Sequence, residues 1–168
     1  MKKSILGLGS ILVFLFSFGL VVQAQTGKEI SEPVTSTWHS TSKVVDLGQD
    51  RSFATFEAFG IIIADAGTGL FHESTNRFLG SRFIEKGVSS NDIGYGYYLL
   101  KNGDKVFYTT TWERKPGATN RGKTTIIGGT GKCAGIQGSW ELTGYPLRPA
   151  GEGISQSYNK LTIKYTLP

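Results

Sequence analysis

The sequence is poor in the residues that bind metals and form disulfides. Its 168 residues include a single cysteine, Cys133, and two histidines, His39 and His72. One thiol excludes an intramolecular disulfide, and because Cys133 lies among glycines and small residues we expect it to be packed and unreactive. No His-x-x-x-His or Cys-x-x-Cys spacing and no Gly-x-Ser-x-Gly elbow occurs. The sequence therefore predicts no metal, no cofactor and no serine hydrolase.

Long runs of one charge sign are also missing. The formal net charge is +5, and the basic residues are spread out among polar and apolar ones. A nucleic-acid-binding protein would concentrate them in one stretch or on one face. The sequence therefore predicts no nucleic-acid partner.

The one long hydrophobic run lies at the N-terminus. Lys2 and Lys3 precede an uncharged apolar stretch over residues 5–22, and a Val-Gln-Ala sequence ending at Ala24 follows. That order is typical of a cleaved signal peptide over residues 1–24, although the run is also long enough for an uncleaved membrane anchor. We expect cleavage, and hence an exported protein, periplasmic or secreted, with no membrane attachment afterwards.

The rest of the chain predicts an all-β domain. Residues 25–33 are polar and predict a flexible leader, and residues 34–168 predict one domain. No amphipathic stretch of helical period is present, and 23 glycines suit short strands joined by tight turns. The expected strands cover residues 34–45, 53–65, 70–85, 93–112 as a hairpin, 124–127, 139–143 and 157–167. Because a closed sheet has no free edges, we expect an eight-stranded antiparallel β-barrel.

The clearest local signal is the Asn102-Gly103 pair between two aromatic-rich runs. It predicts a hairpin with a two-residue type I′ turn. In that register Tyr97 faces Tyr108, and Tyr98 belongs to the opposite face. Both faces then carry aromatic residues, which indicates that the outer wall of the barrel packs against a terminal segment or another subunit.

The strand over residues 53–65 carries two candidate catalytic carboxylates. If the face of Glu57 points into the barrel, this carboxylate is desolvated and is a candidate general acid or base. Alternatively, Gly60 marks a bulge that turns Glu57 outward, or Glu57 pairs with an arginine. Asp65 ends the strand, either at the barrel mouth or as a turn aspartate.

Further candidates come from histidine and from the aromatic residues. His72 beside Glu73 is a candidate proton shuttle, although most lone histidines have no such role. Aromatic side chains in a barrel either fill the core or line a pocket for an apolar ligand. The expected ligand-binding residues are Phe59, Tyr97, Tyr108 and Trp112.

A glycine-rich segment follows the hairpin. The run Gly-Gly-Thr-Gly-Lys over residues 128–132 is not a phosphate-binding loop, because Ile126 stands where that motif has its first glycine and Cys133 where it has Ser or Thr. The segment instead predicts a sharp structural loop in which glycines permit positive φ and close backbone approach. Its glycines are Gly128, Gly129, Gly131, Gly135 and Gly138.

The same segment resembles a motif of the allene oxide cyclase and dirigent proteins. Residues 127–138 are similar to their Gly-Gly-(Thr/Ser)-Gly stretch, which ends on a further glycine. Residues 59–65 resemble the early dirigent strand that ends in an aspartate, here Asp65, and residues 157–168 resemble the last strand. The resemblance implies a calycin-like barrel of eight antiparallel strands with an apolar cavity, assembled as a homotrimer.

The residues that carry chemistry in that family match less well. The sequence has no Glu-x-Asn of an allene oxide cyclase, and Gln137 stands where dirigent proteins place an arginine. Three classes of function therefore stay open. The first, which the sequence favours, is an exported barrel that binds a small apolar molecule. The others are a structural or interaction protein that uses its outer face, and a cyclase- or isomerase-like enzyme with a carboxylate in the cavity.

Overall fold

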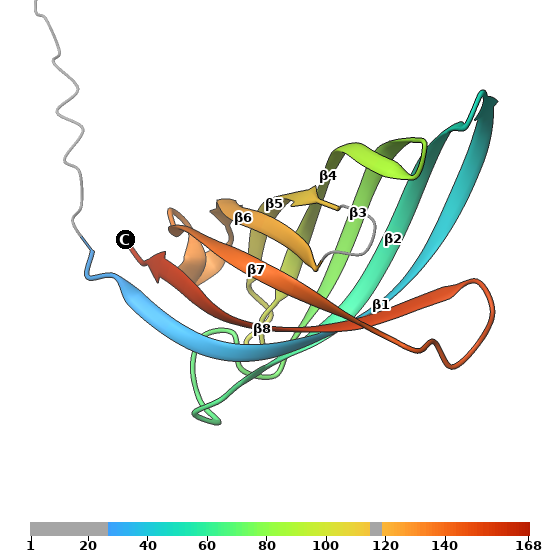
Figure 1. Ribbon diagram of the computed structural model, residues 1–168. Coiled ribbons are helices and arrows are strands. Elements are labelled where there is room, and N and C mark those ends of the chain that lie inside the picture. The colour runs from blue at the N-terminus through green and yellow to red at the C-terminus, as the bar shows by residue number, and fades with distance from the viewer. Residues whose placement is uncertain (1–26, 115–118) are drawn as a thin grey trace, which may run out of the picture.

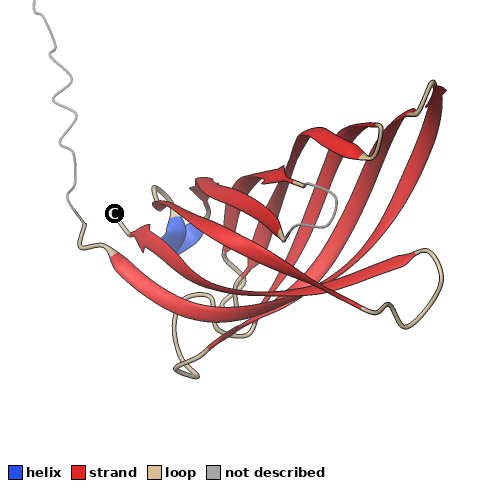
Figure 2. Ribbon diagram, in the orientation of Figure 1, coloured by secondary structure: helices blue, strands red, loops and turns tan. Residues whose placement is uncertain are grey.

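Eight antiparallel strands follow one another around a closed barrel, in which β8 returns to pair with β1 (Figure 1). The computed structural model describes residues 27–114 and 119–168. The strands are β1 (Ile30–Gly48), β2 (Arg51–Ala64), β3 (Ser74–Glu85), β4 (Val88–Leu99), β5 (Lys105–Glu113), β6 (Asn120–Gly129), β7 (Gln137–Leu147) and β8 (Ile154–Thr166), with one 3-10 turn, η1 (Gly131–Cys133), before β7. Strands make up most of the described chain in Figure 2. The predicted all-β, eight-stranded antiparallel barrel is confirmed.

The strands differ from the expected ones mainly at their ends. β1 begins at Ile30, inside the segment expected as a leader, because residues 30–33 pair with β8. β7 continues to Leu147, into an expected loop. The expected signal peptide, residues 1–24, and residues 115–118 of the loop after β5 lie outside the described residues. Among the described residues, no helix is long and apolar enough to cross a membrane.

Alternation along each strand separates an inner face from an outer one. On β8, Ile163 and Tyr165 are buried and Lys164 is exposed, as the sequence predicts. On β2, the even-numbered residues point inward, including Ala58, whereas Phe59 on the outer face is 46% exposed. Apolar side chains therefore lie on both faces of β2.

The β4–β5 hairpin forms with a three-residue loop, and the predicted type I′ turn is wrong. The loop spans residues 101–103, and Gly103 has a φ of +87°. Asn102 does not share the positive φ that a type I′ turn requires; its side-chain oxygen instead accepts the Asp104 N–H at 3.0 Å. One positive φ after a turn is typical of three-residue hairpin loops.

This loop shifts the register of the hairpin by one residue. Tyr97 faces Phe107, and Tyr98 faces Val106. A shift of one residue exchanges the faces of a strand relative to its partner. Tyr98 and Tyr108 therefore share the inner face, whereas Tyr97 points outward.

The bulge predicted as one alternative at Gly60 is absent. β2 pairs with β1 and with β3 without a shift through this residue. The glycine is instead required by a close approach, because a Cβ there would lie 2.0 Å from the carbonyl oxygen of Thr37 on β1. Register shifts occur elsewhere, between Asp46 and Gly48, Ser81 and Phe83, and Phe107 and Tyr108.

The glycine-rich segment forms a structural loop between β6 and β7. The Thr130 hydroxyl accepts the Lys105 N–H at 2.8 Å, and the Asp104 carboxylate accepts the Lys132 N–H at 3.1 Å, so the loop is tied to the β4–β5 hairpin. Gly131 has a φ of +54°, which favours glycine. Cys133 is buried inside the loop, and burial raises the pKa of its thiol.

One end of the barrel is filled by the loop between β2 and β3. Phe71 from this loop is fully buried and meets three aromatic rings edge-on, those of Tyr98, Tyr165 and Trp140, at centroid distances of 5.3, 5.4 and 6.5 Å. We call this the Phe71 end. The core of the barrel is concentrated here.

Glu32 on β1 holds the loop in place. Its buried carboxylate accepts the backbone N–H groups of Leu70 and Phe71, both at 3.1 Å, and lies 3.3 Å from the Tyr165 hydroxyl. Burial raises the pKa of Glu32, and these three hydrogen bonds offset part of that rise.

Glu32 gives the stability of the protein a component that declines as the pH rises. Because its folded-state pKa lies above the unfolded value, its contribution is complete below the unfolded pKa and is lost as the pH passes through the folded one. Glu32→Gln can still accept from the loop and does not titrate. Urea titrations between pH 4 and 8 give the difference in free energy of unfolding between the wild type and each variant. We expect the difference between the wild type and Glu32→Gln to fall as the pH rises. The difference between the wild type and the surface control Glu141→Gln is expected not to fall. A constant or rising difference for Glu32→Gln would contradict this.

Candidate functional site

A cavity of about 260 Å³ lies inside the barrel, beyond the Phe71 end. Its inner limit includes Tyr98 and Trp140, which pack on Phe71. At the opposite end of the barrel its lining reaches exposed residues, among them Ser42 and Ser155. The cavity is therefore closed at one end and open to solvent at the other, which we call the mouth.

Aromatic rings form much of the cavity wall. Phe78 on β3 is central: it stacks on Tyr108 at 5.7 Å, tilts against Phe56 at 5.9 Å and meets Trp38 edge-on at 6.3 Å. Trp112 also lines the wall. Rings in offset or edge-on contact make a rigid apolar surface suited to a flat ligand.

A few polar groups interrupt this wall. The hydroxyls of Thr110 and Thr124 bond each other at 2.8 Å, so this pair is internally satisfied. The Tyr108 hydroxyl is buried and has no hydrogen-bond partner in the described part of the chain. Burial raises the pKa of Tyr108 well above its usual value, with neighbouring Tyr98 adding to the rise, so the phenol stays protonated.

Two arginines stand at the mouth. Arg114 donates from Nε to Asp92 Oδ2 at 2.5 Å, and its guanidinium carbon lies 4.8 Å from the Trp112 ring centroid. Arg82, on the inner face of β3, lies with its guanidinium carbon 5.7 Å from the Phe56 ring centroid. Burial lowers the pKa of Arg82, and repulsion from Arg114 adds to this while Asp92 opposes it.

The charges on the cavity wall are of one sign. Among the described residues that line it, Arg82 and Arg114 are charged, and none is an aspartate, glutamate, histidine or cysteine. Asp92 is buried behind the wall and pairs with Arg114. The cavity is therefore aromatic in its walls and cationic at its mouth.

Glu57 lies on the outer face of the barrel, not in the cavity. Arg77 on β3 donates to it at 2.6 Å, so the alternative in which Glu57 pairs with an arginine is the one observed. It faces outward because odd-numbered residues of β2 do so, and no bulge is needed to turn it. This position offers no desolvated acid or base.

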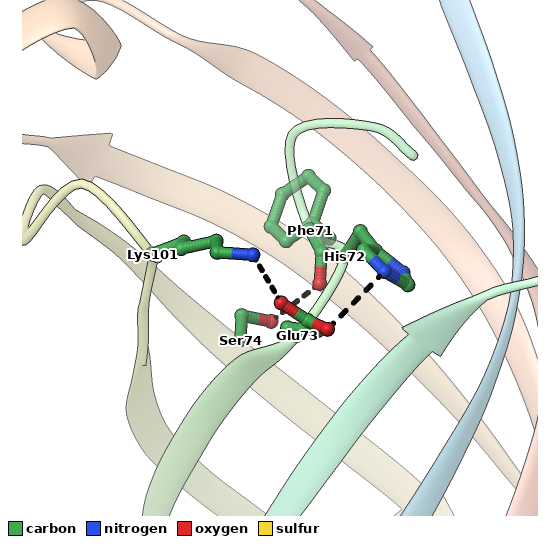
Figure 3. Close-up of polar contacts among 5 residues, drawn as sticks. All are labelled: Phe71, His72, Glu73, Ser74 and Lys101. Atoms are coloured by element: carbon green, nitrogen blue, oxygen red, sulfur yellow. Dashed lines mark hydrogen bonds and ion pairs between the residues drawn. The ribbon is translucent and has the colours of Figure 1, made fainter. Parts of the chain in front are cut away.

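Asp65 and His72 lie at the Phe71 end, opposite the mouth. Asp65 is exposed in the turn that follows β2. His72 Nε2 lies 3.7 Å from Glu73 Oε1, and the side chains of His72 and Glu73 point at each other in Figure 3. Glu73 also binds Lys101. Neither Asp65 nor His72 lines the cavity.

The four expected ligand-binding residues divide between the two faces. Tyr108 and Trp112 line the cavity. Phe59 and Tyr97 lie on the outer wall, where Arg77 and Lys105 approach their rings. The division follows the inner and outer parity of β2 and the one-residue shift in the β4–β5 hairpin.

Several cavity residues were not predicted from the sequence. Trp38, Trp140 and Arg82 are the most important of these. The signal in the sequence that could have identified Arg82 is the alternation of inward and outward residues along β3. Arg82 is four residues after Phe78 and therefore lies on the same face. That signal becomes readable only when the direction of one residue on the strand is known.

An apolar patch, interrupted by the Glu57–Arg77 ion pair, lies on the outer face of β2, β3 and β4. Its rows follow the strand register, in which Glu57, Leu79 and Tyr95 are neighbours. Tyr95 is 58% exposed, and Leu79 is exposed to a similar degree. The exposed apolar members are Phe59, Ile61, Ile63, Leu79, Tyr95 and Leu99.

No protein-family model matches this chain, and no significant match is found among curated proteins. Within residues 27–114 and 119–168, no group of three or more His, Cys, Asp or Glu side chains is arranged to hold a metal ion.

Proposed function

We propose that the protein is an exported barrel, periplasmic or secreted, that binds a small molecule with an apolar body in its cavity. The observation that carries the proposal is the aromatic-walled cavity, closed by Phe71 at one end and open at the other. Concave, mostly apolar sites with a few polar groups are typical of small-molecule binding. The glycine segment and the eight sequential strands support a barrel of the allene oxide cyclase and dirigent type as part of this proposal.

An enzyme of the cyclase or isomerase class has less support. Such an enzyme needs an acid or base within reach of its ligand. The candidates Glu57, Asp65 and His72 all lie away from the cavity wall. Binding is therefore the function that the geometry favours.

Native mass spectrometry of the protein purified from the cells that produce it tests the proposal. We expect a retained small molecule that is lost on unfolding. Ala58→Leu fills the cavity, because Ala58 lines it, and we expect this variant to lose most of the adduct. Thr55→Leu, on the outer face of the same strand, is the matched control and retains the adduct. An adduct that survives Ala58→Leu unchanged would place the ligand elsewhere.

A second candidate is an interaction role for the outer face. The apolar patch over β2, β3 and β4 supports it, since large exposed apolar patches mark contact surfaces. The occupant that we propose is a second and third copy of this chain, as a homotrimer. The same native spectra measure this directly: a trimer mass supports it, and a monomer mass at micromolar concentration contradicts it.

A further inference from the structure

We infer that the ligand is an aryl carboxylate, whose carboxylate pairs with Arg82 at the cavity mouth and whose ring lies against Trp38, Phe56 and Phe78. The inference rests on the proposed binding function and names the chemical class of the ligand. It depends on the Arg82 guanidinium, which has no partner anion within residues 27–114 and 119–168 and lies beside the aromatic wall.

Arg82 is an arginine at an inward-facing strand position, and no described residue forms an ion pair with it. It pairs across the sheet with Ala54, which is fully buried. The Arg82 Nε is buried and has no hydrogen-bond partner in the described part of the chain, where Arg82 also makes no ion pair. A half-buried guanidinium that is neither paired nor fully hydrated is unfavourable. A bound anion would remove that unfavourable state.

The charges that face Arg82 leave one positive charge uncompensated. Arg114 repels it and Asp92 attracts it. Asp92 already accepts Arg114 Nε through one carboxylate oxygen. Counted over the described residues, the mouth thus holds two guanidinium groups and one carboxylate, so an anion is favoured there and a cation is not. Serine hydroxyls at the rim add donors that an anion can use: Ser40, Ser42, Ser155 and Ser157.

The position of the aromatic wall indicates what the anion is attached to. The Phe56 ring that Arg82 covers is in contact with Phe78, and Phe78 meets Trp38. A planar ring placed on this wall directs a substituent toward the mouth. The cavity, about 260 Å³, suits one or two rings rather than a long acyl chain, since pockets for drug-sized ligands span roughly 300–1,000 Å³.

Three probes that share one ring system and differ in charge separate the contribution of the charge from that of the ring. Isothermal titration calorimetry of the full-length protein measures 2-naphthoate, the neutral 2-naphthamide and the cationic 2-naphthylmethylammonium. We expect the carboxylate to bind at least tenfold more tightly than the amide, and the cation most weakly, because charge-assisted bonds to a guanidinium are strong. Arg82→Gln is expected to reduce carboxylate affinity to that of the amide and to leave amide affinity within twofold. Arg77→Gln, on the same strand but on the outer face, changes neither.

The outcomes distinguish the inference from the proposal beneath it. Equal binding of carboxylate and amide to the wild type overturns the aryl carboxylate and leaves cavity binding in place. The aryl carboxylate is also overturned if Arg77→Gln weakens carboxylate binding and Arg82→Gln leaves it unchanged. If no probe binds, the aryl carboxylate is overturned, and the cavity-binding proposal is then decided by the native mass spectra alone. If the probes bind but Ala58→Leu leaves all three affinities unchanged, they bind outside the cavity, which overturns the aryl carboxylate at Arg82. If Arg82→Gln does not fold, Arg82→Lys serves instead, because it keeps the positive charge but loses the planar guanidinium with its paired donors. We expect this variant to bind the carboxylate more tightly than the amide, but by a smaller factor than the wild type does.

Discussion

Phe71→Ala is expected to lower the free energy of unfolding by about 3–5 kcal/mol, the range for removing a buried phenylalanine. The side chain is 0% exposed and contacts three aromatic rings at the closed end of the barrel. Those rings come from β4, β7 and β8, which cannot close over the void without moving the sheet. The cavity left behind therefore adds to the lost transfer free energy.

Denaturation in urea, followed by tryptophan fluorescence and circular dichroism, measures this effect. Phe59→Ala is the matched control, because Phe59 lies on the outer face of β2, is 46% exposed, and should cost under about 1 kcal/mol. Equal losses in the two variants would show that Phe71 does not fill the barrel end. Phe71→Leu restores part of the volume and is expected to fall between the wild type and Phe71→Ala.

Phe71 also supports the candidate site from behind. Its ring packs on Tyr98 and Trp140, and both of these line the cavity on their other side. Loss of Phe71 therefore removes the support of the cavity wall. The ligand affinity of Phe71→Ala at temperatures where it remains folded should fall along with its stability.

The barrel was predictable because its signals are local. One such signal is the strict alternation of apolar and polar residues along β8, and another is the glycine-rich turns between strands. Both depend only on neighbouring residues. The preference for a closed sheet followed from the number of strands and from apolar residues on both faces. The structural role of the loop after β6 was readable from its glycines for the same reason.

The site was less predictable because it depends on which face points inward. Aromatic residues lie on both faces of β4, so composition does not identify the inner one. The answer depends on the loop at residues 101–103, whose one extra residue exchanges Tyr97 for Tyr98 on the inner face. This loop places Tyr97 on the outer face, whereas Phe59 lies there because the odd-numbered residues of β2 point outward. Arg82 on β3 was hidden in the same way, because composition does not show which face of β3 points inward.

The Phe71 end was hidden for a different reason. The sequence around Phe71 is continuous with the strand that follows, and residues 70–85 predict one long or two short strands that begin at Leu70. The loop that places Phe71 inside the barrel is held by Glu32, 39 residues earlier in the chain. Contacts of this range leave no local pattern in the sequence.

Gly60→Ala is expected to lower the free energy of unfolding by about 3 kcal/mol, the upper part of the range for overpacking. A Cβ at this position would lie 2.0 Å from the Thr37 carbonyl oxygen and 3.1 Å from the Asn76 side-chain oxygen. The first of these is backbone within the β1–β2 pairing, so it cannot rotate away as a side chain would. The strands have to separate locally, which weakens hydrogen bonds in the longest pairing of the barrel.

Two other glycines separate this steric effect from a general effect of alanine. At Gly144, a strand residue, the nearest atom to an added Cβ is 3.4 Å away, and at Gly151, in a loop, it is 3.6 Å away. Both are ordinary contacts, so we expect changes within about 1 kcal/mol for Gly144→Ala and Gly151→Ala in the same urea titrations. Equal losses in the free energy of unfolding for the three variants would mean that β1 and β2 can separate at Gly60 at little cost. A loss confined to Gly60→Ala would show that the close approach of β1 to β2, and not a bulge or bend, is why glycine is required there.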